Sequence, residues 1–312
     1  MEEVYRFERI SPGSYPHLVT LMRRCFGIEV PLERIRAKFN TGRFGASDLG
    51  YLAFSPSGAV AAYYGVFPVL VRSSGKVVLA AQSGDTMTDP DHQKRGLFIK
   101  LAKRTYALAR DEGVRFVFGF PNENSFPGFQ NKLDWVFAGR LQEFRFRVST
   151  IPLCELAARY GRLQSAYDVF ADRRLSRYKV SHGMEDVAFD NQDGDALLHD
   201  QRFMDYKRSM GAKSIMFDGF TMVVKAHTHL YIGDVARVPL DRVPDLRRAL
   251  RRLARRLYCR TVVITVSKEH WLHDALRDQL GSVESLPIGY LALDGSSSLA
   301  PLTFARIDLD TF

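Results

Sequence analysis

The chain has 312 residues, of which 46% are hydrophobic and 25% are charged, so it is long enough for two globular domains with sizeable cores. No apolar run approaches the roughly 18 residues that span a bilayer, and the N-terminus lacks the apolar segment of a signal peptide. Three isolated cysteines, Cys25, Cys154 and Cys259, argue against a disulfide framework and favour a reducing, cytoplasmic location. The net charge of +9 favours an anionic partner, such as nucleic acid, anionic lipid or a phosphorylated cofactor.

The first half of the sequence predicts alternating helices and strands. Apolar residues at helical spacing predict helices over 15–25, 32–39, 96–112 and 127–133. β-rich or near-continuously apolar segments predict strands over 5–10, 50–54, 59–71, 77–88, 114–120 and 141–148. This order is typical of an α/β fold with a mixed, mostly antiparallel central sheet flanked by helices.

The second half repeats this pattern after a helical and polar connection with helices over 151–160 and 163–178. Strands are then predicted over 220–232, 261–266, 289–293 and 302–309, and helices over 245–257 and 269–280. The segments 116–146 and 262–293 share one order of strand, turn, helix and strand, which favours an internal repeat. The predicted domains are 1–150, the connection 151–200, and a degenerate second copy over 201–312.

The most informative segment joins the strand that ends at Thr88 to the helix that follows it. Its loop, Gln93-Lys94-Arg95-Gly96, opens directly into the helix, where unpaired amides and the macrodipole favour an anion. Lys94 and Arg95 add positive charge, and Gly96 lets a diphosphate come close because it has no Cβ. We therefore predict a phosphate-binding loop over Gln93–Leu97.

This junction resembles the signature of the GNAT superfamily of acyl-CoA-dependent N-acyltransferases, in which Gln or Arg is followed by two residues, Gly, one residue, and Gly or Ala. Here the segment reads Gln93-Lys94-Arg95-Gly96-Leu97-Phe98, so Phe98 replaces the final small residue and is expected to crowd or shift the loop. The resemblance covers about residues 3–148 and implies that coenzyme A binds at the loop as the acyl-CoA co-substrate. It also implies that the strands ending at Thr88 and Phe120 splay apart to admit pantetheine. The further cofactor-binding residues implied are Thr86, Met87, Thr88, Asn122, Asn124 and Ser125.

Asp85 is the candidate catalytic residue. A carboxylate on the strand beside the thioester can remove the proton of an attacking amine, which makes Asp85 the expected general base. Many GNAT relatives have a Tyr near the start of the next helix that protonates the departing thiolate, but the matching position here is Gln130, so the thiolate is expected to leave unassisted or to be protonated through water. The alternative is structural: Asp85 caps a turn or pairs with an Arg, and Asn122 and Asn124 only hold a turn.

The resemblance implies transfer of the acyl group to a primary amine. The segments Phe120–Phe129 and Ile307–Phe312 resemble bacterial GNAT proteins linked to surface-polysaccharide assembly, some of which acylate nucleotide-linked amino sugars. Such a sugar is therefore the expected small-molecule acceptor. Arg202, Tyr206 and Tyr231, in the second half, are its candidate binding residues.

Two other functions fit the sequence. A tandem-GNAT aminoacyl transferase that uses charged tRNA would need a basic groove, which the arginine-rich face of 245–257 could line. A non-catalytic CoA-binding protein would account for Gln130. We expect nucleic acid not to be a partner, because most such arginine runs are solvated helix faces. No metal is expected either, because His227 and His229, which alternate on a predicted strand, have no third ligand at usable spacing.

Overall fold

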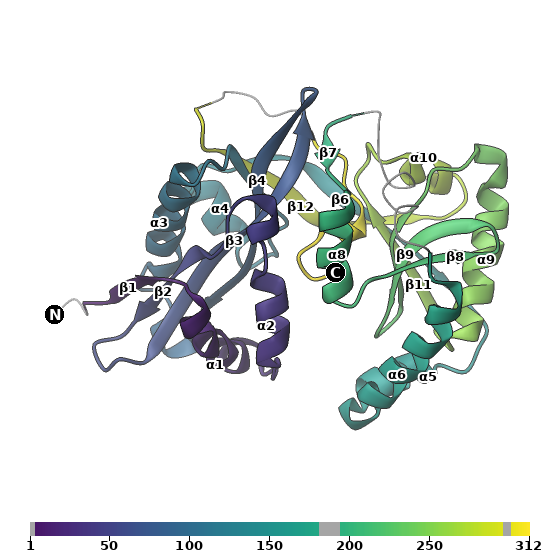
Figure 1. The fold of residues 1–312 in the computed structure, drawn as a ribbon, viewed down its shortest axis with the longest axis horizontal. Coiled ribbons are helices and arrows are strands. Elements are labelled where there is room, and N and C mark those ends of the chain that lie inside the picture. Colours follow the sequence, from purple (N-terminus) through teal and green to yellow (C-terminus); the bar gives the residue numbers. More distant parts are fainter. Residues whose placement is uncertain (1–3, 181–193, 296–300) are drawn as a thin grey trace. The chain divides into compact units, whose positions relative to one another are not determined.

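The computed structural model describes residues 4–180, 194–295 and 301–312. These form two compact units, each made of two pieces of chain. The N-terminal unit comprises residues 1–139 with 286–301, and the C-terminal unit comprises 140–285 with 302–312. Figure 1 labels most of the elements of both units, and each unit is described by itself.

A mixed sheet forms the centre of the N-terminal unit. Its strands, in their order across the sheet, are β1 (Arg6–Arg9), β2 (Leu49–Phe54), β3 (Val60–Ser73), β4 (Lys76–Thr88), β5 (Phe116–Gly119) and the part of β12 (Ser282–Ala292) that begins at residue 286. All neighbouring strands are antiparallel except β4 and β5, which are parallel because α3 (Leu97–Asp111) connects them. The sheet is therefore mixed and mostly antiparallel, as predicted, and β1 to β5 lie in chain order.

Apolar cores cover both faces of this sheet. The first contains side chains of α1 (Tyr15–Phe26) and α2 (Leu32–Phe39), and the second contains side chains of α3 and α4 (Phe126–Lys132). Successive residues of a strand point to opposite faces, and β3 shows this directly: Tyr63 belongs to the first core and Tyr64 to the second. A side chain near the end of β4 therefore faces either α1 and α2 or α3 and α4.

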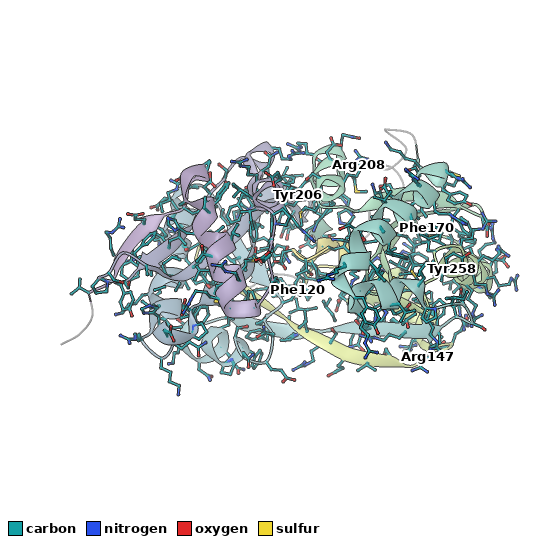
Figure 2. The ribbon with its side chains drawn as sticks, turned by 90° about the horizontal axis from the view of Figure 1, so that it is seen from below. Phe120, Arg147, Phe170, Tyr206, Arg208 and Tyr258 are labelled. Carbon is teal, nitrogen blue, oxygen red and sulfur yellow. The ribbon has the colours of Figure 1, made fainter. Side chains whose placement is uncertain are left out.

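The C-terminal unit is built around a second mixed sheet. Its strands, in order, are β6 (Val136–Arg147, from residue 140), β11 (Thr261–Val266), β10 (Leu230–Val235), β9 (Phe220–Ala226) and β8 (Lys213–Phe217). Only β10 and β11 are parallel, and α9 (Val243–Arg256) connects them. The other elements are α5 (Leu153–Arg159), α6 (Gln164–Leu175), β7 (Ala196–Leu197), α8 (Gln201–Ser209) and α10 (Trp271–Arg277). Phe170 of α6 stacks on Tyr258, just after α9, with the ring centroids 5.8 Å apart (Figure 2).

The two halves of the chain share one order of elements. Strands β2, β3 and β4 are followed by α3, β5, α4 and β6; strands β8, β9 and β10 are followed by α9, β11, α10 and β12. The last strand of each series completes the sheet of the other unit, because β6 pairs with β11 and β12 pairs with β5. This exchange is why each compact unit contains two pieces of chain, whereas the expected domains were continuous; part of the expected connection, 181–193, lies outside the described residues.

Three predictions about the second half are wrong. The segment 302–309 is not a strand: the Asp308 carboxylate accepts the backbone N–H of Ala305 at 2.7 Å, and a 3-10 helix forms over Arg306–Asp308. The predicted single strand 220–232 is the hairpin of β9 and β10. His227 and His229 lie in its turn, where the His227 N–H donates to the His229 carbonyl at 3.1 Å, so they do not alternate on a strand. Helix α8 and strand β8 were not predicted.

Among the described residues, no helix combines the length and apolar character needed to cross a membrane. The expected repeat of one supersecondary unit agrees with the shared order of elements, and the α/β fold class is confirmed.

Candidate active site

The parallel pairing of β4 with β5 stops well before β4 ends. It joins Ala81–Ser83 to Val117–Gly119, whereas β4 continues to Thr88. Among the described strands, none pairs with this side of β4 beyond Ser83. An unpaired strand edge presents backbone N–H and C=O groups that an extended ligand can bind. The pairing ends at Gly119, the last residue of β5, so the end of β4 has the free edge that the predicted splaying of these two strands requires.

A β-bulge shapes the unpaired part of β4. On the β3 side, Tyr63 pairs with Met87 and Gly65 with Gly84, so Tyr64 lies opposite two residues, Asp85 and Thr86. Strand β4 thus has one extra residue here, and Asp85 adopts a left-handed backbone conformation with φ +51°. Such bulges redirect side chains and backbone amides, and they recur beside active sites.

The loop that follows β4 has the geometry of an anion site. Lys94 and Gly96 have φ values of +61° and +71°, and Arg95 between them does not have a positive φ. Alternating backbone conformations of this kind turn successive N–H groups toward one point. Gly96 is the N-cap of α3 and no side chain caps the helix there, so its first amides face the loop. Residues 93–96 are all exposed.

The Phe98 ring does not crowd the loop, contrary to the expectation from the sequence. The Phe98 ring packs in the core of α3 and α4, with its centroid 5.1 Å from that of Phe129 and 5.7 Å from that of Tyr64. Gly128 makes room for it, since a Cβ at Gly128 would lie 2.5 Å from the Phe98 ring. The large side chain is thus accommodated by a glycine in α4, away from the exposed loop.

Arg24 and Asp89 anchor the turn between β4 and the loop. Asp89 is 2% exposed and accepts hydrogen bonds from Arg24, with Nη2 at 2.9 Å from Oδ1, and from the Asp91 N–H at 3.0 Å. The hydrogen bond from Arg24 lowers the pKa of the Asp89 carboxyl, although burial opposes it. Arg24 also contacts Asp91 at 2.7 Å, which ties α1 to the start of the loop.

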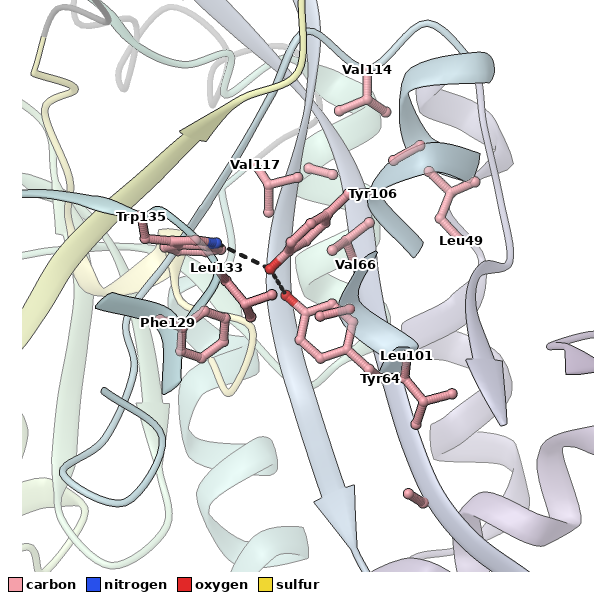
Figure 3. Packing of buried hydrophobic residues seen from close by; sticks show 14 of the residues in the cluster. Leu49, Tyr64, Val66, Leu101, Tyr106, Val114, Val117, Phe129, Leu133 and Trp135 are labelled. Carbon is pink, nitrogen blue, oxygen red and sulfur yellow. Dashed lines mark hydrogen bonds between the residues drawn. The ribbon is translucent and has the colours of Figure 1, made fainter. Parts of the chain in front are cut away.

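A buried chain of hydrogen bonds supports the point where β4 and β5 separate. The Tyr106 hydroxyl lies 2.7 Å from the Tyr64 hydroxyl and accepts the Trp135 indole N–H at 3.0 Å (Figure 3). Tyr64 also contacts the Ser83 hydroxyl at 2.9 Å, and Ser83 is the last residue of β4 paired with β5. Burial raises the pKa of both tyrosines, so they remain hydrogen-bonding hydroxyls at neutral pH. These linked hydrogen bonds were not predicted from the sequence.

The side chain of Asp85 lies on the face of the sheet covered by α2. Its Oδ2 is 2.7 Å from Nζ of Lys38, and both side chains are mostly buried. Met87, two residues further along β4, is 2% exposed and belongs to the same core, so only its backbone can face a ligand. Thr86 and Thr88 are half-buried. Asp85 therefore pairs with a Lys rather than with the Arg considered from the sequence.

The asparagine turn after β5 is held by its own hydrogen bonds. Asn122 Oδ1 accepts the backbone N–H groups of Asn124 and Ser125, both at 3.1 Å, and the Ser125 hydroxyl at 3.2 Å. These contacts support the structural interpretation of Asn122, while Asn124 and Ser125 keep some exposure at the start of α4. Gln130 lies on α4 and is exposed.

The three candidate acceptor residues all lie in the C-terminal unit. Arg202 is on α8, with its guanidinium 2.6 Å from Asp200, and is half exposed. Tyr206, one turn further along α8, is 3% exposed, so its ring offers little surface to a ligand. Tyr231 is on β10, 2.5 Å from the Thr228 hydroxyl and beneath the Arg306 guanidinium, which lies 4.1 Å from its ring centroid.

The arginine-rich face of α9 is largely paired. Arg252 contacts Asp218 at 2.6 Å, Arg247 contacts Gln279 at 2.7 Å, and Arg251 lies over the Phe146 ring. These contacts favour a solvated helix face. Among the described residues, no group of three or more potential ligands is placed to hold a metal ion.

Residues 6–138 match the model of the acetyltransferase (GNAT) domain. The matched region contains the open edge of β4, the loop and Asp85. The family uses acyl-CoA as its co-substrate, so the match supports GNAT acetyltransferase chemistry for the N-terminal unit. Among curated proteins, none matches the chain.

Solved structures share the fold over nearly the whole chain. A GCN5-related N-acetyltransferase from Kribbella flavida has a TM-score of 0.56 and 14% identity, covering 93% of this chain and 72% of that one. A putative acetyltransferase from Pyrococcus horikoshii has a TM-score of 0.53 and 13% identity, covering 96% and 93%. A GCN5-related glucosamine N-acetyltransferase region of a fungal multi-domain GH3 β-N-acetylglucosaminidase has a TM-score of 0.53 and 11% identity, covering 93% and 38%. These likenesses extend the shared GNAT-type architecture over both units.

Proposed function

We propose that the chain is an N-acyltransferase that moves an acyl group from acyl-CoA to the primary amine of a small molecule, with a nucleotide-linked amino sugar as the acceptor. The observation that carries the proposal is the early end of the β4–β5 pairing, directly before an exposed loop at the N-terminus of α3. Pantetheine contains two amides in an extended chain, so it can pair with the open edge of β4 as an added strand does.

The loop is proposed to hold the CoA pyrophosphate. The amides of Gln93–Leu97 and the N-terminus of α3 provide donors and a partial positive charge, and Lys94 and Arg95 add full charges. The left-handed backbone at Gly96 directs these amides to one side while leaving space there, since nothing lies within 4 Å of a Cβ built on Gly96. The backbone of Thr86, Met87 and Thr88 would bind the pantetheine arm, with Asn124 and Ser125 beyond it.

Asp85 is proposed to accept the proton of the amine. The nitrogen attacks the thioester carbonyl, the C–N bond forms as its proton passes to Asp85, and the C–S bond then breaks. The departing thiolate takes up a proton from water, because Gln130 offers no acid at the position where relatives have Tyr. A β4 amide released by the bulge would stabilise the negative charge that develops on the carbonyl oxygen.

The amino-sugar acceptor is supported by chemistry. A diphosphate-linked sugar needs cationic partners, which the surplus of +9 charges provides. The amine of a sugar has a lower pKa than that of Lys because ring oxygens withdraw electrons, so a carboxylate is a sufficient base. The fungal glucosamine N-acetyltransferase region provides an example of amino-sugar acylation on this fold. Arg202 and Tyr231 are proposed acceptor contacts; a buried Tyr206 would act only by supporting α8.

Two measurements test this proposal. Coenzyme A should raise the melting temperature of the protein, because a ligand that binds only the folded state stabilises it. With acetyl-CoA, free thiol should be released in the presence of glucosamine or a UDP-linked amino sugar, and faster with the acceptor that fits. No thermal shift at millimolar CoA would exclude the cofactor site. Thiol release only with a polyamine or with lysine would exclude the sugar.

The role of Asp85 has its own test. Asp85→Asn should lower kcat by roughly 10²–10⁴ with little change in CoA affinity, the usual cost of losing a general base. The residual rate should rise with pH as free amine accumulates. A kcat close to that of the wild type at pH 7 would remove Asp85 from the reaction.

A further inference from the structure

Asp85 forms an ion pair with Lys38, a residue that the sequence analysis did not single out. Lys38 is in the last turn of α2, and its Nζ lies 2.7 Å from Asp85 Oδ2. Its side chain is 12% exposed and that of Asp85 14%, and Nζ also lies 4.8 Å from the centroid of the Phe67 ring. A surface lysine at the end of a short helix would normally extend into water. Here the Lys38 ammonium instead lies against the β-bulge of β4, where it contacts Asp85.

The described groups around the Lys38–Asp85 pair offer Asp85 little other stabilisation of its negative charge. Tyr63, on β3, is 1% exposed, and its hydroxyl has no hydrogen-bond partner among the described residues. Burial, and next the negative charge of Asp85, raise the pKa of Tyr63 well above its usual value. Beyond Tyr63, the Tyr15 hydroxyl donates to Asp48 at 2.6 Å. The titratable groups described near Asp85 are thus the Lys38 ammonium on α2 and the Tyr63 phenol on β3, and both Asp85 and Asp48, which precedes β2, add negative charge around Tyr63.

We propose that Lys38 is a positioning residue for the acyl transfer: its ammonium keeps Asp85 ionised and fixes the carboxylate beside the open end of β4. The inference rests on the proposed function. A carboxylate that is mostly buried without a cation becomes protonated at higher pH, and a protonated Asp85 cannot accept the proton of the amine. Lys38 thereby sets the lowest pH at which the reaction runs, without touching either substrate.

The test compares Lys38→Met and Lys38→Arg with the wild type. Methionine keeps the length and apolar stem of Lys38 but removes the charge, whereas arginine keeps the charge. In Lys38→Met, the acidic limb of the kcat/KM–pH profile should move up by about one to three pH units, the usual effect of one close opposite charge. At one pH unit below the wild-type limb, the variant should therefore be about ninefold or more less active than the wild type. Lys38→Arg should keep the limb within half a unit, and Lys103→Met, which removes an exposed charge on α3, should leave the profile unchanged.

A second readout does not depend on turnover. The carboxyl carbon of Asp85, observed by ¹³C NMR in aspartate-labelled protein and assigned with Asp85→Asn, should titrate at higher pH in Lys38→Met than in the wild type. Lys38→Gln provides a second neutral side chain where Lys38→Met fails to fold. An unchanged carboxyl titration overturns the inference, and so does a loss of activity that is equal at every pH. Failure of the wild type to bind CoA would instead overturn the proposed function, while leaving the NMR result to decide the ion pair.

Discussion

Replacing Gly96 with Val tests the phosphate loop, and the structure provides a matched control in the same helix. Gly96 begins α3 with φ +71°, and Gly113 follows its other end with φ +86°. A Cβ built on either glycine has nothing within 4 Å. Valine at either position therefore meets backbone strain but no clash, at a cost to folding of about 1–2 kcal/mol for a left-handed L-residue.

The two variants should differ only in CoA binding. In Gly96→Val the added methyl groups occupy the space that the diphosphate approaches, so the Kd should rise at least tenfold, a loss of about 1.4 kcal/mol. At a CoA concentration of about 100 times the wild-type Kd, the ligand stabilises the wild type by about 2.7 kcal/mol and Gly96→Val by about 1.4 kcal/mol or less. Gly113→Val should keep the wild-type stabilisation.

Calorimetric titration gives the Kd, and urea unfolding with and without CoA gives the stabilisation. The reasoning fails if Gly96→Val binds CoA as tightly as the wild type does. It also fails if Gly113→Val weakens binding as much as Gly96→Val does, because strain alone would then explain the loss.

Three further changes follow from the contacts of the described residues. Tyr106→Phe should lower the free energy of unfolding by about 1–3 kcal/mol in urea denaturation, because the buried Trp135 N–H loses its acceptor, and an unchanged midpoint would contradict this. The stability that Asp89 contributes should be present above pH 4 and be lost as the pH falls through its lowered pKa, so wild type and Asp89→Asn should converge in acid unfolding. For His199, burial alone would lower the pKa, but the charge and hydrogen bond of Asp308 raise it overall. The stability that His199 contributes should therefore be present below about pH 6.5 and decline as the pH rises. The stability of His199→Gln should approach that of the wild type only at alkaline pH.

The sequence predicted best those elements whose apolar pattern is strong. The predicted bounds of α2 at 32–39 and β11 at 261–266 agree with the structure, and the helices and strands of the first half lie close to their predicted positions. Helix α8 was missed because it is short and mostly polar, and β8 because only a few residues separate it from α8. The hairpin of β9 and β10 was merged into one strand because its turn, His227–His229, contains neither Gly nor Pro.

The candidate site was predictable where it is local in sequence. The loop and the splayed strands follow from one continuous segment, whereas the Lys38–Asp85 ion pair joins residues that are far apart along the chain. The position of Phe98 likewise depends on a glycine in another helix, Gly128. Contacts of this kind depend on tertiary packing and have no signature in a single sequence.

The exchanged last strands make the order of synthesis matter. When β5 leaves the ribosome, its outer edge has no neighbour until β12 is made, at almost the other end of the chain. Until then the nascent N-terminal half carries an open edge, and such edges invite pairing with other chains. A fragment that ends after β6 would lack β12, the neighbour of β5, so we expect the N-terminal half to be less stable alone than in the whole chain. Supplying the missing strand as a peptide should rescue a truncated chain, in the manner of a split protein.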